Sequence, residues 1–260
     1  MIDIRTFKNG DRITINSHQF PFLSEGVKRV LIPYCEEMIR LHGENLLAIL
    51  LYGSATGEDF VPKTSNINLL LYLKKIELSD LKKSLKLVEK GRRKRIVAPL
   101  FFTPHQLQSS LDVFPIEFLE IKENHLTLYG QDPFENLEIQ KGNIRLQCEE
   151  QLKGKYLRLC QAYLEIGPVK KGLERVMRES LISLIPVFRN LLRLKVEKPP
   201  LGKEEVLRRI GEEFGVHGDT FFEILKGKQK NEWMTSLQAE RIFERYLHEI
   251  EKISNVIDQL

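Results

Sequence analysis

A glycine-serine pair and two nearby asparagines are the residues whose types and spacing point most directly to chemistry. Gly53 and Ser54 follow a run of seven apolar residues. After a spacer of eleven residues, Asn66 and Asn68 stand on either side of Ile67. A glycine at the end of a buried strand lets the backbone approach a phosphate closely, and a serine offers its hydroxyl and amide N–H to the phosphate oxygens. Because side chains two positions apart on a strand share a face, the pattern predicts a phosphate-binding turn beside a pair of residues that can reach one ion.

Two apolar runs frame this turn and predict buried strands. Leu46–Tyr52 and Ile67–Leu73 are apolar at almost every position, which is typical of strands covered on both faces. Further strands are expected at Ile96–Phe102, Ile116–Ile121 and His125–Tyr129. Helices are expected at Glu25–Leu41, which Ser24 can cap, at Ser79–Lys90 and at Thr103–Ser110. Residues 1–140 are therefore predicted to form a mixed-sheet domain of the α/β (α+β) class.

The second part of the chain has a different pattern. From Asn143 onward, nearly every stretch carries the three-to-four-residue apolar spacing of amphipathic helices. Helices are predicted at Ile144–Ile166, Val169–Val196, Lys203–Phe214, Asp219–Lys226 and Thr235–Leu260. This change of pattern predicts an all-α helical bundle domain over residues 141–260.

The first strand, the turn and the second strand resemble the signature of the DNA polymerase beta-like nucleotidyltransferase superfamily. In that signature an apolar residue, a Gly and a Gly or Ser precede a spacer and then two acidic residues that flank an apolar one. Tyr52, Gly53, Ser54 and the eleven-residue spacer match it, and the resemblance covers roughly residues 25–130. It implies a nucleotidyltransferase-like sheet domain followed by a helical domain, a nucleoside triphosphate (NTP) held at Gly53 and Ser54, and Mg²⁺ as cofactor.

The acidic pair of the family is replaced by amides in this sequence. Asn66 and Asn68 occupy its two metal-binding positions and carry no charge. An Asn carbonyl ligates Mg²⁺ only weakly, and two neighbouring divalent ions need several negative ligands to offset their mutual repulsion. We therefore expect two-metal catalysis to be lost or severely weakened.

The resemblance also implies a third carboxylate, on a later strand of the sheet. Glu117 is the residue that we match to it, as metal ligand and catalytic residue, because it alternates with apolar neighbours in Ile116–Ile121. Asp112 matches this position less well. Glu58 and Asp59, in the spacer, are further candidates to supply negative charge to the site.

A basic run after the second predicted strand is the other candidate for binding. Eight Lys and Arg residues fall within fourteen positions, against a single Glu89. They are Lys82, Lys83, Lys86, Lys90, Arg92, Arg93, Lys94 and Arg95. One interpretation is a solvated helix face with a basic last turn that suits the helix dipole. The other is a salt-sensitive patch for the phosphates of RNA, DNA or nucleotides, without base stacking because no aromatic side chain interleaves with the run.

The composition narrows the class of protein. With 260 residues, 42% hydrophobic, 29% charged and a net charge of +4, the sequence is neither collagen-like nor disordered. No apolar run approaches the roughly 20 residues of a membrane helix, and no apolar h-region follows Met1, so we expect a cytoplasmic protein without a membrane partner. Cys35, Cys148 and Cys160 form no CxxC pair, which argues against a disulfide framework and a thiolate zinc site.

Three functions stay open from the sequence. We favour a nucleotidyltransferase-fold pseudoenzyme that serves as a nucleotide-binding, regulatory or interaction module, without a required cofactor. The second is an active Mg²⁺-dependent nucleotidyltransferase that moves a nucleoside monophosphate from an NTP to a hydroxyl acceptor. The third is a basic module that contacts RNA or a protein through Lys82–Arg95. A protein partner or a homo-oligomer is compatible with each of them.

Overall fold

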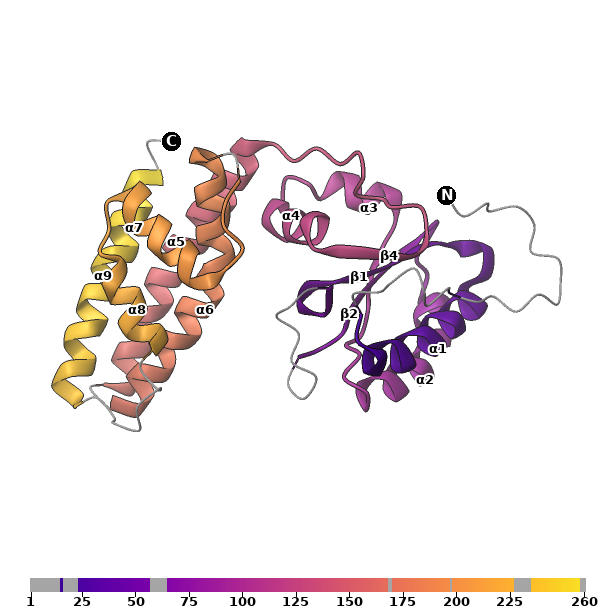
Figure 1. Cartoon of the computed structure of the whole chain (residues 1–260), viewed down its shortest axis with the longest axis horizontal. Helices are drawn as coiled ribbons and strands as arrows, with labels where there is room; N and C mark the ends of the chain where they lie inside the picture. The colour runs from indigo at the N-terminus through magenta and orange to yellow at the C-terminus, as the bar shows by residue number, and fades with distance from the viewer. Residues whose placement is uncertain are drawn as a thin grey trace. The chain divides into compact units, whose positions relative to one another are not determined.

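Two compact units make up the described part of the chain (Figure 1). One lies within Met1–Leu111 and Glu117–Glu138, and the other within Asp112–Ile116 and Ile139–Leu260. The first unit holds a mixed sheet with helices and the second is helical, which confirms the fold class predicted from the sequence. The structure is a computed structural model, and it describes residues 15, 23–56, 65–167, 170–196, 198–226 and 235–257.

The sheet of the first unit has four strands in the order β3-β2-β1-β4. The central strand β1 pairs antiparallel with both β2 and β4, while β3 lies parallel to β2. The strands are β1 (Leu46–Tyr52), β2 (Asn68–Leu73), β3 (Leu100–Phe102) and β4 (His125–Gly130). The prediction of buried strands from the two apolar runs is confirmed.

Helices cover both faces of this sheet (Figure 1). On one face, Leu31 and Met38 join Ile49 and Leu71 in a single buried cluster. On the other face, the ring of Phe118 contacts the rings of Phe102 and Phe134. The helices are α1 (Glu25–His42) and α2 (Leu78–Arg92) on the first side, and α3 (Pro104–Ser109) and α4 (Pro115–Glu123) on the second.

The helix starts follow capping residues that the sequence carries. The Ser24 hydroxyl accepts a hydrogen bond from the Val27 N–H at 3.4 Å, as predicted for the first residue before α1. Thr103 and Gln106 form a capping box at α3, in which each side chain accepts from the other's backbone N–H at 3.1 Å. These bonds satisfy N–H groups that have no partner inside their helix.

Two strand predictions need correction. Ile116–Ile121 lies inside the helix α4 and is not a strand. Glu117 and Glu120 are three residues apart, which is the spacing of one helix face and not the two-residue period of a strand. Pro115 also suits a first helical turn because it has no N–H to donate. The strand predicted at Ile96–Phe102 is shorter, because only Leu100–Phe102 extends the sheet and Pro99, which cannot donate to the ladder, precedes it.

The second unit is a bundle of helices with an aromatic core. Phe221 packs against Phe188 and Tyr246, and the Tyr246 hydroxyl lies 3.0 Å from the Ser180 hydroxyl. No helix within the described residues combines the length and apolarity that a bilayer-spanning segment requires. The five predicted helices are confirmed as α5 (Lys141–Ile166), α6 (Lys170–Lys195), α7 (Lys203–Phe214), α8 (Gly218–Lys226) and α9 (Ser236–Ile257).

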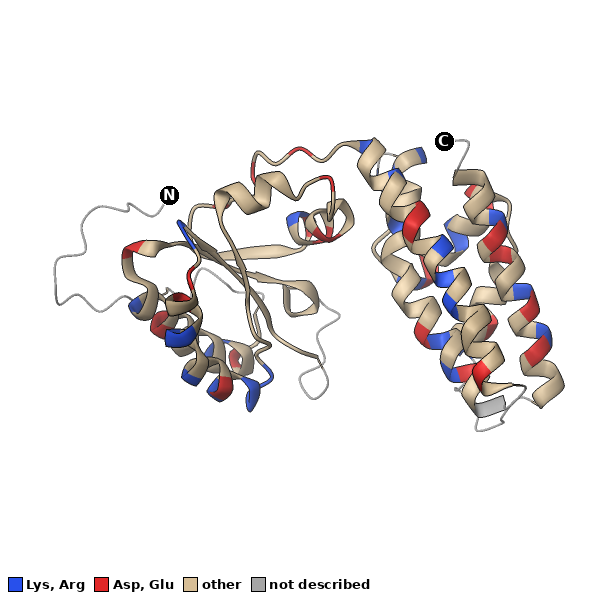
Figure 2. Cartoon of the chain, turned by 180° about the vertical axis from the view of Figure 1, so that it is seen from behind, with Lys and Arg blue, Asp and Glu red and all other residues tan. Residues whose placement is uncertain are grey.

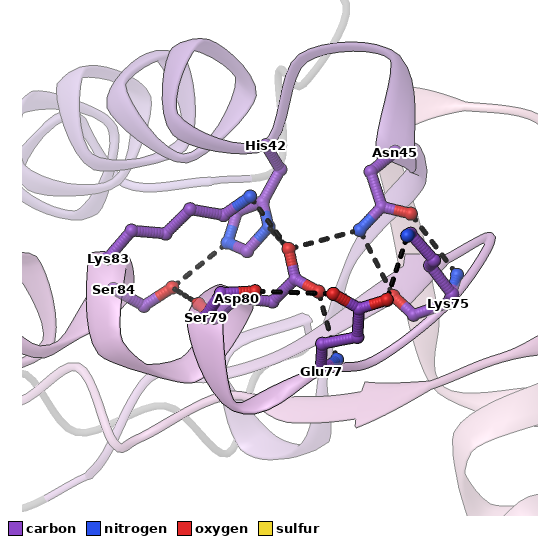
Figure 3. A network of polar contacts seen from close by, with 8 residues as sticks. All are labelled: His42, Asn45, Lys75, Glu77, Ser79, Asp80, Lys83 and Ser84. Carbon is purple, nitrogen blue, oxygen red and sulfur yellow. Dashed lines mark hydrogen bonds and ion pairs between the residues drawn. The ribbon is translucent and has the colours of Figure 1, made fainter.

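A buried polar network joins the end of α1 to α2, near the start of β1 (Figure 3). His42 Nε2 lies 2.9 Å from the Ser84 hydroxyl, which donates its own proton to the Asp80 carbonyl at 2.9 Å. His42 Nε2 must therefore be the donor to Ser84, which leaves Nδ1 without a proton in the neutral ring. The Asp80 carboxylate accepts from Asn45 Nδ2 at 3.3 Å and pairs with Lys83 at 2.7 Å.

The surroundings of His42 favour its neutral form. Burial, and then the nearby ammonium of Lys83, lower the pKa of His42 to about 4, although Asp80 acts in the opposite direction. An unfolded chain returns this pKa to about 6.5. As pH falls through 6.5, the unfolded state takes up a proton that the folded state does not, so stability is lost between about pH 6.5 and pH 4.

Acidification is therefore expected to destabilise the first unit through His42. Between pH 7 and pH 5 the free energy of unfolding should fall by about 2 kcal/mol more in the wild type than in His42→Gln, which has no proton to gain. Urea unfolding at the two pH values measures the difference. His105→Gln, which removes an exposed histidine, is the control and should keep the wild-type pH dependence. A His42→Gln variant with the same pH dependence as the wild type contradicts the prediction.

Candidate functional site

The turn that follows β1 places Gly53 directly against β2. This turn is a 3₁₀ segment, Gly53–Thr56, and Gly53 has φ of 78°, a left-handed conformation that favours glycine. A Cβ at this position would lie 3.1 Å from the Asn68 side-chain amide nitrogen. The Gly53 N–H donates to the Asn124 carbonyl at 3.3 Å, and the Thr56 hydroxyl donates to the Gly53 carbonyl at 2.8 Å. The N–H and the carbonyl of Gly53 are thus both hydrogen-bonded, and the Asn68 amide lies beside this residue.

The sheet register explains why the predicted site residues meet. Tyr52 pairs with Asn68 across the β1–β2 ladder, so the residue before the turn and the first residue of β2 are neighbours. Asn68 is half-buried and Asn66 is exposed. The hydroxyl of Ser54, also half-buried, forms no hydrogen bond with another described residue. Gly53, Ser54 and Asn68 therefore form one polar corner at the end of the hairpin, with Asn66 two residues from Asn68.

The third expected ligand has a different position from the one predicted. Glu117 lies on the helix α4, so it is not carried by a later strand of the sheet. The strand beside β2 is β3, and the bridges Ile67–Ile96 and Leu70–Leu100 place Val97 and Ala98 alongside Asn68. Neither of these residues has a carboxylate.

The donors available at the turn fit a pair of Mg²⁺ ions poorly. Asn66 and Asn68 contribute neutral amides, and the neighbouring strand contributes apolar side chains. Asp112 is assigned to the other compact unit, and Glu58 and Asp59 lie outside the described residues. Within the described ranges no three His, Cys, Asp or Glu side chains gather where they could hold a metal. Two adjacent divalent ions need more negative charge than two amides supply.

A histidine-aspartate pair at the same end of the sheet was missed from the sequence. His125 begins β4 opposite Tyr52, and its Nε2 lies 3.0 Å from Asp132 Oδ2. Its Nδ1 lies 2.9 Å from the Ile121 carbonyl at the end of α4. The histidine thus joins α4 to β4 and positions Asn124, whose carbonyl accepts the Gly53 N–H. No sequence signal reveals the pair, because the chain must turn back after β4 to bring Asp132 to the ring.

Most of the basic residues predicted as a second binding surface lie along α2, away from this corner. All eight are on α2 or in the turn that follows it. Some of them have acidic partners, since Lys83 pairs with Asp80 at 2.7 Å and Arg93 lies 3.6 Å from Glu89. Arg95 comes nearest to the corner formed by Gly53, Ser54 and Asn68, because its carbonyl accepts a hydrogen bond from the Ile67 N–H at 2.8 Å.

Comparison with known proteins identifies the fold of the chain. No family model and no curated protein sequence matches it. Among solved structures, it is similar to the spectinomycin adenyltransferase AAD(9) from Enterococcus faecialis, solved with ATP and spectinomycin, with a TM-score of 0.51 and 12% identity. The similarity covers 82% of this chain and 97% of that one. The chain therefore has a nucleotidyltransferase-like fold with a helical C-terminal region.

The conformation of Gly53 generates a stability prediction. Gly53→Ala should lower the free energy of unfolding by about 1–2 kcal/mol, because a side chain at positive φ is strained and displaces the Asn68 amide. Gly142→Ala is the matched control, since nothing lies within 4 Å of a Cβ there and alanine suits a helix better than glycine. Urea unfolding of both variants measures the effect. Equal changes in the two variants would rule out a special requirement for glycine at position 53.

Proposed function

We propose that this chain is a catalytically impaired nucleotidyltransferase-fold protein that binds a nucleotide and acts as a regulatory or interaction module. The observation that carries the proposal is the presence of two neutral amides, Asn66 and Asn68, at the positions where the resembled family has its carboxylate pair. Asn68 lies against the glycine of the turn, so the amide stands beside the expected phosphate position. The nucleotidyltransferase-like fold supports the same assignment.

The proposed loss of catalysis follows from the missing negative charge at the metal-binding positions. In metal-assisted nucleotidyl transfer, divalent ions activate the attacking hydroxyl and stabilise the charge that develops on the phosphate. Asn66 and Asn68 supply dipoles in place of two negative charges, and Val97 and Ala98 supply none. The ions therefore lack the ligands that would hold them in the positions that such a reaction requires.

We expect the protein to bind a nucleotide although asparagines replace the acidic pair, because amides can contact phosphates directly. A carboxylate pair repels a triphosphate unless a cation lies between them, whereas an asparagine amide donates hydrogen bonds directly to phosphate oxygens. The Asn68 amide, the Ser54 hydroxyl and the backbone beside Gly53 supply such donors at one corner of the sheet. Binding through them needs no metal, so the affinity should be weak and indifferent to Mg²⁺.

Calorimetry tests this proposal. ATP, GTP, CTP and UTP should each be titrated into the protein with and without Mg²⁺, and at least one is expected to bind with a dissociation constant of about 0.1–1 mM, as a few neutral hydrogen bonds allow. The constant should change little with the metal. Tight Mg²⁺-dependent binding with release of pyrophosphate would instead establish an active nucleotidyltransferase.

Restoring the acidic pair should reverse the dependence on metal. The double variant Asn66→Asp, Asn68→Asp is expected to bind Mg²⁺ measurably, and to bind the nucleotide more weakly than the wild type unless Mg²⁺ is present, because its carboxylates repel the phosphates. Titrations of metal alone and of nucleotide measure the two effects. The control Asn143→Asp, Gln161→Glu adds the same charge in the helical unit and should leave both unchanged. If the double variant gains no affinity for Mg²⁺, positions 66 and 68 are not those of the acidic pair.

A further inference from the structure

A groove of about 530 Å³ lies between α1 and α2 on the first unit. It is built from an apolar floor and a row of cations, and it shares no residue with the corner at Gly53. The floor consists of Val30, Pro33, Leu41 and Leu87. The cations are Arg40, Lys83, Lys86, Lys90 and Lys94, and Glu37 is the one carboxylate among the described residues that line the groove.

Three of the lysines have no acidic partner. Among the described residues, Lys86, Lys90 and Lys94 make no ion pair, whereas Lys83 pairs with Asp80 and Arg40 lies 2.9 Å from Glu37. Lys86 and Lys90 are four residues apart on α2, which sets their side chains about 6 Å apart along one face, and Lys94 follows in the turn after the helix. Like charges at this helical spacing are destabilising, so an anion bound beside them would relieve the repulsion.

The positive charge of the protein is concentrated in this region. Residues 78–95 hold 8 of the 40 Lys and Arg and 2 of the 36 Asp and Glu. The rest of the chain, with 32 basic and 34 acidic residues, has a net charge of −2. Figure 2 shows Lys and Arg along α2, whereas the facing helix α1 carries both basic and acidic residues. A polyanion that approaches the protein is therefore attracted to this surface in particular.

Tyr34 is one of the residues that line the groove, and its hydroxyl is a hydrogen-bond donor. Its ring packs against Gly91, where a Cβ would lie 2.7 Å from the ring carbon Cε2. Its hydroxyl is buried and has no hydrogen-bond partner within the described part of the chain. Burial raises the pKa of Tyr34 well above its usual range, so the hydroxyl keeps its proton. A buried donor without an acceptor is costly, and an anion in the groove would supply the acceptor.

We propose that the groove between α1 and α2 binds the phosphate backbone of a single-stranded nucleic acid. The extended row of ammonium groups matches a chain of single negative charges, so that Lys86, Lys90 and Lys94 each meet one phosphate. Apart from Glu37, which Arg40 pairs, the charged groups that line the groove are hydrogen-bond donors, and phosphates present acceptor oxygens at each step. Among its described lining residues no exposed aromatic ring offers a base a surface for stacking, so the binding does not depend on base sequence.

Fluorescence anisotropy tests the proposal with labelled RNA and DNA strands of the same mixed sequence, about 15 nucleotides long. Three contacted phosphates predict a slope of about −2 for the logarithm of the binding constant against that of salt concentration, between about 50 and 200 mM. RNA and DNA should bind within about threefold of each other, because phosphate contacts do not read the 2′-hydroxyl.

The key variant is Lys86→Gln, Lys90→Gln, Lys94→Gln. It should weaken binding at least about tenfold at low salt and flatten the salt dependence, because the three phosphate contacts are lost. Lys74→Gln, Lys198→Gln, Lys203→Gln removes the same charge from three exposed lysines outside the groove and should bind as the wild type does. Asn66→Asp, Asn68→Asp should also leave this binding unchanged, which separates it from the proposed nucleotide site.

Three results would overturn the proposal. They are equal weakening by the two lysine variants, no binding of either strand by the wild type at low salt, and competition by polyglutamate as effective as that by RNA. The last result would assign the groove to an acidic protein.

Tyr34→Phe provides a second test, because it should weaken RNA binding a few-fold while it raises the urea midpoint of the unbound protein. A rise in stability without weaker binding would show that the hydroxyl takes no part.

Discussion

Burial of β1 on both faces is the constraint on which the first unit depends. Ile49, Leu50 and Leu51 are fully buried, and each such side chain contributes roughly 1.5–3 kcal/mol relative to exposure. A strand of this kind must be central in its sheet and must be covered twice, by α1 and α2 on one side and by the aromatic cluster around Phe118 on the other. Polar chemistry is therefore displaced to the two ends of the strand.

An asparagine lies near each end of β1, and the two have different surroundings. At the start of β1, Asn45 exchanges hydrogen bonds with the backbone of Lys75 and donates to Asp80, so its amide is used within the fold. At the other end, the Asn68 amide lies beside Gly53, in a corner where the side chain of a different residue at position 53 would collide with it. Asn45 joins the start of β1 to the residue that follows β2. Asn68 lies where we propose that a ligand binds. The same residue type thus has a structural role in one setting and a proposed role in ligand binding in the other.

The two anion-binding sites that we propose in the first unit differ in their charge. The corner at Gly53 offers neutral donors, which suit a few directed hydrogen bonds to one ligand. The groove between α1 and α2 offers full positive charges in a row, which suit an extended polyanion and make its binding sensitive to salt. The buried carboxylate of Asp80 neutralises Lys83 at one end of this row, and the lysines beyond it keep their charge available. The proposed nucleotide site thus depends on neutral hydrogen bonds, and the proposed nucleic-acid site depends on ionic attraction.

The sequence by itself determined the elements whose patterns are local. Continuous apolar runs specify strands buried on both faces, the three-to-four-residue spacing specifies the helices, and the Gly53-Ser54 turn with Asn66 and Asn68 was recognisable from type and spacing. The strand prediction around Glu117 was wrong although the three-residue spacing of Glu117 and Glu120 is a local signal for the helix that the structure contains. Only the tertiary structure decided the pairing of His125 with Asp132, and the groove in which the lysines of α2 meet Tyr34 of α1. These contacts join segments whose approach depends on how the whole chain packs, which no local pattern encodes.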